Sequence, residues 1–577
     1  MEHRNETEKN ELPMGGPGGP GGPDGPGFPE EPKEPVIPYA EKYFTDFETI
    51  SDQEAAIFVT DLELMGGIET ADGLKFGETE MFSYADFAAA LHKVALGDTT
   101  ALCQALCPPE GMSRMEAAQV LRKALLASDG TGCLPKVYYK NVIAPEEGTT
   151  VIDRAYIFSD TTSAINNKGT SQLIVRNSHV VGSTTGETKQ LSGPPAGLLV
   201  SGNMRTTLAM YQSQAFYINS KVDVANWAVF ATDGAEPAYD DDHKELTLWV
   251  YGTEGNAHRG GYGTYSDLFC NVHFYGTKIQ VPEIGAISGT FGKLNLDNIA
   301  AGEQDLELSA RLTEEDKALQ PDKTTGTVIR SGRTGIMIHC VSLPPYWGRP
   351  GYSQTELPYH SGVVTIRNST VETDLSLGNQ VQYPADAAAY IQHHKGSVIL
   401  VKSCNAEILV ENSQLIPDPK GTNGILHTVI NSDIAFSVKV PDGTVYPGIR
   451  ATLKNDKLTG DVIHEDYQRD LYLTLEGTEW SGKLYTGTVD SWRVSAEQEG
   501  FACFIIDPEG YQTVHGSHVV LTAGAIWNVT GESNLNELTI SEDAQILGVH
   551  GKVEMTVDGV PTEIQAGHYC GSIVLRT

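Results

Sequence analysis

The stretch LIVRNSHVV (173–181) decides the fold, because it joins an apolar strand, an Asn-Ser pair and a second short apolar strand. The same order returns in four further stretches: AFYINSKVD (215–223), VTIRNSTVE (364–372), ILVENSQLI (408–416) and TVINSDIAF (428–436). Asn177 and Asn219 are 42 residues apart, and Asn368 and Asn412 are 44 residues apart. Half of each spacing predicts a repeat of roughly 21–22 residues, and a strand-turn-strand repeat of this length is typical of a solenoid.

These repeats resemble a right-handed parallel β-helix of the pectate-lyase and adhesin type. One coil cannot bury its own apolar face, so stacked coils share one core. Each turn Asn is expected to adopt the left-handed αL conformation and to bond to the Asn of the next coil. The stretch IWNVTGESNLNELTISEDAQILG (526–548) is similar to the last coils of large β-helix surface proteins. VDGVPTEIQAGHYCGSIVL (557–575) is predicted to close the open end as a hairpin cap.

The chain before the repeats divides into a tail and a helical part. Residues 1–38 are rich in Gly and Pro and are predicted to be disordered. Residues 39–132 are predicted to form a small helical domain, and residues 133–577 the β-helix with its cap. Ser83 and Ser113 are expected to cap two helices, because an acidic residue, Asp86 or Glu116, follows three positions later.

The helical part resembles an S-layer-homology module. The resemblance rests on EAAIFVTDLELMGGIETADGLKFGETEMFSYADFAAALHKVALG (54–97) and on SRMEAAQVLRKAL (113–125), in which Ser113, Arg114 and Glu116 match the start of a helix in that family. The resemblance implies binding of a cell-wall polymer. A helical docking or dimerisation domain, with a homo-oligomer as the result, is the alternative.

Composition excludes several classes of protein. With 40 Lys+Arg against 75 Asp+Glu, the 577-residue chain has a net charge of −35, which opposes binding to nucleic acid and to anionic membrane surfaces. No apolar run approaches the ~18 residues of a spanning helix, so no membrane insertion is expected. The first residues lack the apolar segment of a secretory signal, which favours the cytoplasm, with the cell surface as the alternative. The eight cysteines are scattered and predict neither disulfides nor a metal site.

Polar aromatic, histidine and arginine side chains gather between residues 243 and 427, which indicates a site for a small-molecule or carbohydrate substrate. The predicted catalytic residues are His339, Tyr383, His427 and Tyr265. The predicted substrate-binding residues are Arg259, Tyr262, Arg333, Tyr346, Trp347, Arg349, Tyr352, His360, Tyr390, His394 and Lys395.

The spacing of these residues predicts a column on one face of the solenoid. His339, His360, Tyr383, Cys404 and His427 follow one another at intervals of 21, 23, 21 and 23 residues, each close to one predicted coil. Residues one coil apart stack on the same face, so His339, His360, Tyr383 and His427 are expected to line one groove.

The predicted chemistry is acid/base catalysis without a cofactor or a metal ion. The sequence has no P-loop, no GxSxG elbow and no HExxH motif. A His or Tyr base with an arginine beside the developing negative charge predicts a lyase or isomerase acting on a polyhydroxylated, sugar-acid or phenolic substrate. The alternatives are a non-enzymatic adhesin or wall-associated solenoid, and a glycoside hydrolase using acids such as Asp241, Asp242 and Asp267. The run Asp240–Asp242 predicts either a solvated turn or a calcium site.

Overall fold

A computed structural model describes most of the chain. The described residues are 38–160, 163–182, 205–224, 228–233, 245–266, 270–289, 292–339, 361–379, 394–402, 404–429, 446–466, 469–487, 516–549 and 551–577. The predicted disordered tail lies outside this set, apart from its last residue.

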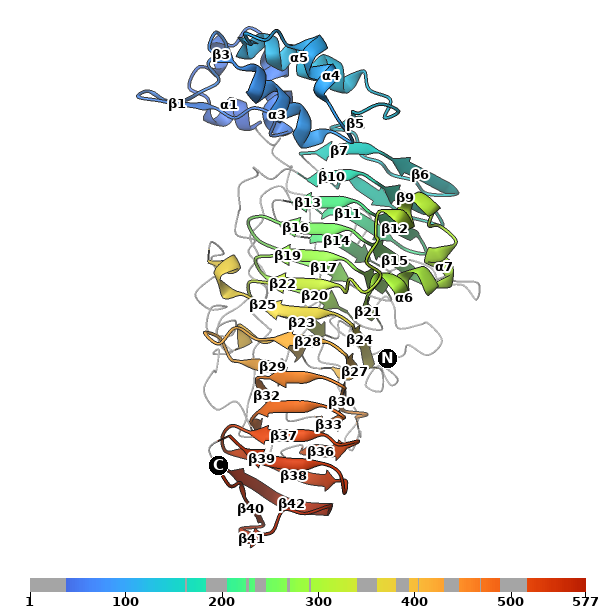
Figure 1. Cartoon of the computed structure of the whole chain (residues 1–577), viewed down its shortest axis with the longest axis vertical. Helices are drawn as coiled ribbons and strands as arrows, with labels where there is room; N and C mark the ends of the chain where they lie inside the picture. The colour runs from blue at the N-terminus through green and yellow to red at the C-terminus, as the bar shows by residue number, and fades with distance from the viewer. Residues whose placement is uncertain are drawn as a thin grey trace, which may run out of the picture.

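The molecule is predominantly β, and its strands form three long sheets that are almost wholly parallel (Figure 1). Through most of the molecule the chain visits sheets I, II and III in order, and each strand pairs with the strand three places further on. Sheet I contains β5 (Lys136–Tyr139), β7 (Ala155–Ser159), β10 (His179–Gly182), β13 (Lys221–Val224), β16 (Glu254–Ala257), β19 (Lys278–Val281), β22 (Val328–Ser331), β25 (Thr370–Thr373) and β28 (Gln414–Ile416).

Sheet II contains β8 (Ile165–Asn167), β11 (Arg205–Met210), β14 (Ala228–Asp233), β17 (Tyr262–Ser266), β20 (Ile284–Ser288), β23 (Thr334–His339), β26 (Ile399–Lys402), β29 (Gly424–Val429), β32 (Asp461–Glu465) and β35 (Leu484–Thr486). A further parallel sheet of β31 (Lys457–Thr459), β34 (Glu479–Gly482), β37 (Ile526–Val529) and β39 (Gln545–Gly548) accompanies the last circuits.

Sheet III is the longest. Its strands are β6 (Thr149–Asp153), β9 (Gln172–Arg176), β12 (Gln214–Ile218), β15 (Leu246–Tyr251), β18 (Cys270–Tyr275), β21 (Lys293–Asp297), β24 (Ser361–Arg367), β27 (Asn405–Glu411), β30 (Ile449–Lys454), β33 (Leu471–Glu476), β36 (Ser517–Thr522) and β38 (Ser533–Ile540), followed by the closing strands β40 (Glu554–Val557), β41 (Val560–Thr562) and β42 (Gly567–Arg576).

The length of one circuit differs from the prediction. Some circuits do have the predicted length, as the one from Ile449 to its partner Leu471. The step from Arg176 to Ile218 is almost twice as long, however, and it is a single circuit because β9 pairs directly with β12. Halving the Asn-Ser spacing was therefore wrong. The fifth stretch, TVINSDIAF, is also misassigned, because its first residues belong to β29 of sheet II rather than to a strand of sheet III.

The Asn-Ser pairs form the turns from sheet III to sheet I. The four turn asparagines Asn177, Asn219, Asn368 and Asn412 all have a positive φ of 46–51°, as the sequence predicts. They do not bond to one another, however. Asn177 donates to Asp153 at 3.1 Å, and Asn368 donates to Asp297 at 2.8 Å.

The hydroxyl residue that follows each of these turn residues forms hydrogen bonds from one circuit to the next instead. The Ser220 hydroxyl accepts the backbone N–H of Ser178 at 3.2 Å, and the Thr253 hydroxyl accepts the N–H of Ser220 at 3.1 Å. The Ser413 hydroxyl accepts the N–H of Ser369 in the same way at 3.1 Å. A hydroxyl in this place satisfies a buried N–H that the tight turn removes from the strand ladder.

The inward side chains of the three sheets form one continuous apolar core. Short β-branched and Leu-rich strands fill it, and Phe274 points into it while His273 and Tyr275 point outward, as their alternation predicts. Near the C-terminal end Trp480 stacks on Trp527 with ring centroids 4.9 Å apart. Each fully buried large side chain contributes about 1.5–3 kcal/mol, so burial is the main source of stability.

Three short helices cover part of the outer face of sheet III, where the sequence predicted none. They are α6 (Ile299–Gln304), α7 (Leu306–Ser309) and α8 (Glu314–Ala318), all between β21 and β22 (Figure 1). Ile299, Leu308 and Leu312 pack on an aromatic cluster of the sheet that includes Phe216 and Trp249.

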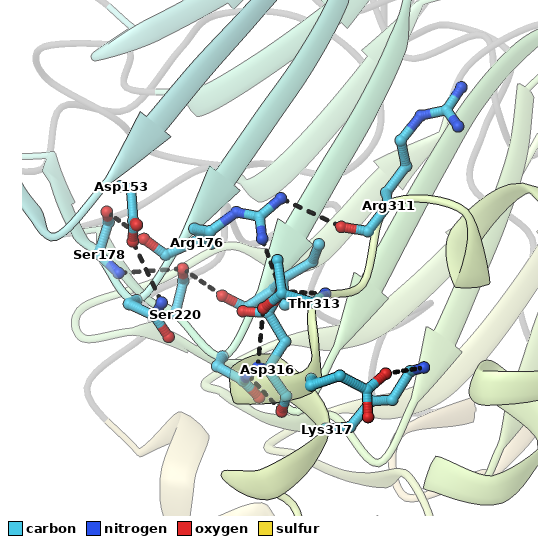
Figure 2. A network of polar contacts seen from close by, with 12 residues as sticks. Asp153, Arg176, Ser178, Ser220, Arg311, Thr313, Asp316 and Lys317 are labelled. Atoms are coloured by element: carbon cyan, nitrogen blue, oxygen red, sulfur yellow. Dashed lines mark hydrogen bonds and ion pairs between the residues drawn. The ribbon is translucent and has the colours of Figure 1, made fainter.

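A buried ion pair holds this insertion in place. Figure 2 shows Arg176 of β9 reaching Asp316 of α8, with Nη1 to Oδ2 at 2.7 Å, while Nη2 donates to the backbone carbonyl of Arg311 at 3.1 Å. Asp316 also accepts the backbone N–H of Thr313 at 2.8 Å in a capping box that starts α8. One carboxylate thus both caps the helix and docks it on the sheet.

Helices predominate between residues 39 and 126. They are α1 (Tyr39–Tyr43), α2 (Gln53–Asp61), α3 (Tyr84–Val94), α4 (Thr100–Leu106) and α5 (Arg114–Leu126), with a 3₁₀ turn η1 (Phe47–Thr49), a hairpin of β1 (Ile68–Thr70) and β2 (Gly73–Lys75), and the pair β3 (Met81–Phe82) and β4 (Met112–Ser113). The capping boxes predicted at Ser83 and Ser113 are both present. Arg114 is buried and donates to the carbonyls of Phe76 and Gly66.

This helical region packs on the first strands of sheet I. Its apolar cluster continues into Tyr156, Phe158 and Val181 of β7 and β10. Asp61 of α2 accepts a hydrogen bond from the Tyr139 hydroxyl at 2.7 Å. Burial raises the pKa of Asp61 to about 6, although Tyr139 and Lys140 act in the opposite direction. Within the described residues, no helix is long and apolar enough to span a bilayer.

The other end is closed by antiparallel strands, as the sequence predicts. β40 and β41 form a hairpin, and β42 pairs antiparallel with both β40 and β38 (Figure 1).

Candidate functional site

The outer face of sheet II carries a cluster of buried ionisable side chains. Most of this face is apolar, with Tyr262, Ile287, Met337 and Leu400 in one group of buried residues. His427 is the register partner of Leu400 on the next strand of sheet II, so the apolar part of the face is followed by a polar part. Ionisable groups so shielded from water are costly unless they are paired.

His427 lies at the centre of this cluster, between a carboxylate and a hydroxyl. Its Nε2 is 2.9 Å from Oε2 of Glu465, and its Nδ1 is 3.2 Å from Oγ of Ser397. His427 is 1% exposed, and Ser397 and Glu465 are also buried. An ionised carboxylate only accepts hydrogen bonds, so it holds the imidazole proton on Nε2 and leaves the Nδ1 lone pair facing the serine.

A second group lies at the edge of the same sheet. Nη1 of Arg333 is 3.7 Å from Oε1 of Glu283, and Nη2 of Arg333 is 3.4 Å from Nε2 of His394. Glu283 also accepts the backbone N–H of Gly261 at 2.8 Å. All three side chains are buried. The charge of Arg333 therefore faces a carboxylate, which weakens its predicted role as an anion clamp.

The backbone links the two groups. Ser397 donates its N–H to the carbonyl of His394, and Gly396 donates to the carbonyl of Arg333. Ser397 Oγ also lies 2.9 Å from the Thr422 hydroxyl. Three residues that the sequence marked as site residues, Arg333, His394 and His427, thus belong to one connected polar region.

The predicted column of His339 and His427 is out of register. Met337 pairs with Leu400 and Leu400 with His427, whereas His339 pairs with Lys402 and Lys402 with Val429. His427 is thus two residues away from the row of His339. The nearly equal intervals in the sequence suggested one coil for each of the four intervals between His339 and His427. Only two circuits separate β23 from β29, and the first, from His339 to Lys402, contains a long insertion.

Of the other predicted residues, four are described by the structure and the rest are not. Tyr262 is buried in the apolar part of the outer face of sheet II, and Tyr265 lies on β17 in register with Ala231. Arg259 is half-buried after the end of β16, and Lys395 is half-buried before the start of β26. The residues outside the described parts of the chain are Tyr346, Trp347, Arg349, Tyr352, His360, Tyr383, Tyr390, Asp240, Asp241, Asp242 and Asp267.

Sequence reasoning missed several members of the cluster. Ser397, Glu465 and Glu283 stand in segments with no motif, and only strand register brings them to His427 and Arg333. Lys402 was also missed, although it is 9% exposed and stands in the row between His339 and Val429. Lys402 ends a continuous apolar run, so no alternation of apolar and polar residues marks it in the sequence.

A separate carboxylate on sheet I binds two histidines. Asp223 accepts from Nε2 of His179 at 2.6 Å and Nε2 of His258 at 2.9 Å, and the Lys221 ammonium lies 3.0 Å away. Burial opposes ionisation of Asp223, but these hydrogen bonds and charges outweigh it and hold its pKa well below the usual range. Asp223 is therefore expected to stay ionised at neutral pH, where it can orient both imidazoles.

Together these contacts identify the Ser397–His427–Glu465 group as the part of the described chain best arranged for proton transfer. No family model, no curated protein and no solved structure matches the chain.

Proposed function

We propose that this protein is a parallel β-helix enzyme that transfers protons as a lyase or isomerase on a small polyhydroxylated, sugar-acid or phenolic substrate. The observation that supports this most directly is the hydrogen-bonded row of Ser397, His427 and Glu465 on the outer face of sheet II. The β-helix part of the proposal rests on the pairing of most strands with the third strand after them, in three sheets that are almost wholly parallel.

The geometry suits His427 as a base. Glu465 stabilises the imidazolium that forms when Nδ1 takes a proton, and the low polarity of the surrounding face strengthens that interaction. The proton reaches Nδ1 either directly from the substrate or through the Ser397 hydroxyl. Its return to another carbon gives isomerisation, and loss of a leaving group gives elimination. A positioned base of this kind contributes about 10²–10⁴-fold to the rate.

A cation is also needed beside the carboxylate or carbonyl of the substrate, where negative charge develops. Lys402 lies on β26, the strand that pairs with the strand of His427. It is two residues after Leu400, the register partner of His427, and therefore lies on the same face of sheet II. Arg333, which belongs to the same connected polar region, is the second candidate. We therefore assign the anion-binding role in this proposal to Lys402.

The test is turnover of a panel of uronates and phenolic compounds by the full-length protein, followed by the absorbance of the conjugated product and by NMR for isomers. His427→Ala is expected to lower kcat by at least about 100-fold. Glu465→Gln, which alters a positioning residue, is expected to lower kcat and to shift the pH profile of kcat/KM. The control is His92→Ala, because His92 is exposed on α3 and far along the chain from sheet II.

Each variant is compared with the wild type by thermal unfolding, so that loss of activity is separated from loss of fold. Equal turnover by His427→Ala and wild type would remove the site. Absence of turnover by the wild type on the whole panel would reject the enzyme and favour the second candidate.

That second candidate is a non-enzymatic, wall-associated solenoid, and it is favoured by the helical region. Ser113, Arg114 and Glu116 match an S-layer-homology helix start, and the buried Arg114 braces the loops at Phe76 and Gly66. Sedimentation of the full-length protein with purified cell walls, together with cell fractionation, tests this role. Binding to walls without turnover of any substrate would support it.

A further inference from the structure

The C-terminal cap holds a cluster of metal-binding side chains on its outer face. Glu537 of β38 and Cys570 of β42 are directly opposite in the antiparallel pair, and His568 lies two residues before Cys570 on the same face. One potential ligand atom from each of the three lies within 4.8 Å of the other two. A thiolate, an imidazole and a carboxylate at such distances form a set that binds Zn²⁺.

The individual contacts point toward one shared centre. Sγ of Cys570 is 3.0 Å from Nε2 of His568, and the same Nε2 is 3.4 Å from Oε1 of Glu537. Three unlike groups therefore converge through the atoms that coordinate metals, while Leu538 and Ile573 of the same strands face the core.

Neighbouring side chains hold these ligands in the orientation that a metal needs. The Thr539 hydroxyl lies 3.0 Å from Nδ1 of His568, which leaves Nε2 for the metal. Nδ1 of His518 lies 2.5 Å from Oε2 of Glu537, which leaves Oε1 for the metal. Such outer contacts fix the tautomer of a ligating histidine and the orientation of a ligating carboxylate.

We propose that Glu537, His568 and Cys570 form a site for Zn²⁺ or a similar divalent transition metal, with solvent at the fourth position. The site joins β42 to β38, and through His518 to β36, so a bound ion fastens the closing strand to the sheet. No short spacing motif predicts it, because the β40–β41 hairpin separates Glu537 from His568 and Cys570 along the chain.

The His179–Asp223–His258 group offers a useful contrast. It also has a carboxylate and two imidazoles, but the Lys221 ammonium lies 3.0 Å from the same carboxylate and repels a cation. It also lacks a thiolate. We therefore expect metal binding at the cap and not at Asp223.

The test is titration of the reduced full-length protein with Co²⁺, which reports thiolate ligation by a charge-transfer band and four-coordination by visible d–d bands. One equivalent is expected to bind, and Zn²⁺ is expected to displace it. Cys570→Ser is expected to abolish the charge-transfer band. His518→Ala, which alters only an outer contact, is expected to keep the band and weaken affinity about 10–100-fold.

Two controls separate the cap from other groups of the chain. His258→Ala removes a histidine of the Asp223 group, and Cys133→Ser removes another partly exposed thiol. Both are expected to leave the cobalt spectrum unchanged. An unchanged band in Cys570→Ser, or no Co²⁺ binding by the wild type, would overturn the proposal, whatever the outcome of the turnover experiments at His427.

Discussion

The outer faces of sheets II and III both bury ionisable side chains, but they use them differently. On sheet III, Arg176 comes from a strand and Asp316 from an inserted helix, so the ion pair joins two elements and lies beside a shared apolar cluster. On sheet II, His427 and Glu465 come from neighbouring strands of one sheet.

This difference separates a structural contact from a functional candidate. Buried ion pairs add little net stability compared with apolar side chains, so the role of each pair is judged by what it positions. The Arg176–Asp316 pair has a structural explanation, since it positions α8 (Figure 2). The His427–Glu465 pair joins neighbouring strands of one sheet, and the other nitrogen of the same imidazole faces the Ser397 hydroxyl, which is why we propose a chemical role for it.

The largest expected effect is at the sheet III pair. Asp316→Ala leaves the Arg176 charge buried and removes the capping box of α8, so the free energy of unfolding is expected to fall by about 3–5 kcal/mol. Urea unfolding measures this loss, and limited proteolysis between residues 298 and 327 reports opening of the insertion.

Glu314→Ala is the matched control, since Glu314 also begins α8 but is exposed and, among the described residues, forms its ion pair with Lys317. We expect it to unfold as the wild type does. A loss below about 1 kcal/mol for Asp316→Ala would mean that the insertion is held by its apolar contacts alone.

The second prediction compares double substitutions on the two faces. Glu283→Gln or Arg333→Met alone removes one partner of a buried ion pair and is expected to cost about 3 kcal/mol, whereas the double variant is expected to recover to within about 1 kcal/mol of wild type. The amide oxygen introduced by Glu283→Gln can still accept the Gly261 N–H. A full double-mutant cycle in urea gives the coupling energy.

The corresponding double variant on sheet III, Arg176→Met with Asp316→Asn, is expected to remain about 1–2 kcal/mol less stable than wild type, since it loses the hydrogen bond to the Arg311 carbonyl that ties the insertion to the sheet. Equal recovery on both faces would show that the two pairs play the same role.

Local rules predicted much of the fold. The positive φ at Asn177, the capping box at Ser83 and the closing hairpin all depend on residues close in sequence, and the sequence is sufficient for each. Helices α6–α8 were missed because each has only four to six residues, too few for a helical period, and tertiary contacts hold them.

The candidate site was predicted only in part, because it depends on register. The sequence marked His427, Arg333 and His394 by residue type, but their partners Glu465, Ser397 and Glu283 come from other circuits of the chain. Insertions change the length of each circuit, so a fixed repeat cannot align these positions. Residue type was informative here, and spacing was not.

The smallest effect on stability is expected at the contact between Asp61 of the helical region and Tyr139 of sheet I. Like the Arg176–Asp316 pair on sheet III, this contact joins two elements. Burial raises the pKa of Asp61 to about 6 from the value of 3.8 for a free side chain. The folded state therefore binds a proton that the unfolded chain releases between these values. This stabilisation is complete below about pH 4 and is lost as the pH rises through about 6, a decrease of about 1–3 kcal/mol in unfolding free energy.

Asp61→Asn removes this titration and keeps an acceptor for the Tyr139 hydroxyl. The variant is therefore expected to show a flatter dependence of stability on pH between about 4 and 7, with the largest difference from wild type near neutral pH. Urea unfolding at several pH values measures it. Asp52→Asn at the half-buried N-cap of α2 is the control, because Asn keeps an acceptor for the Ala55 N–H. If the stability of wild type and of Asp61→Asn had the same dependence on pH, the Asp61 carboxylate would be ionised without cost. The ion pair with Lys140, rather than burial, would then control this contact.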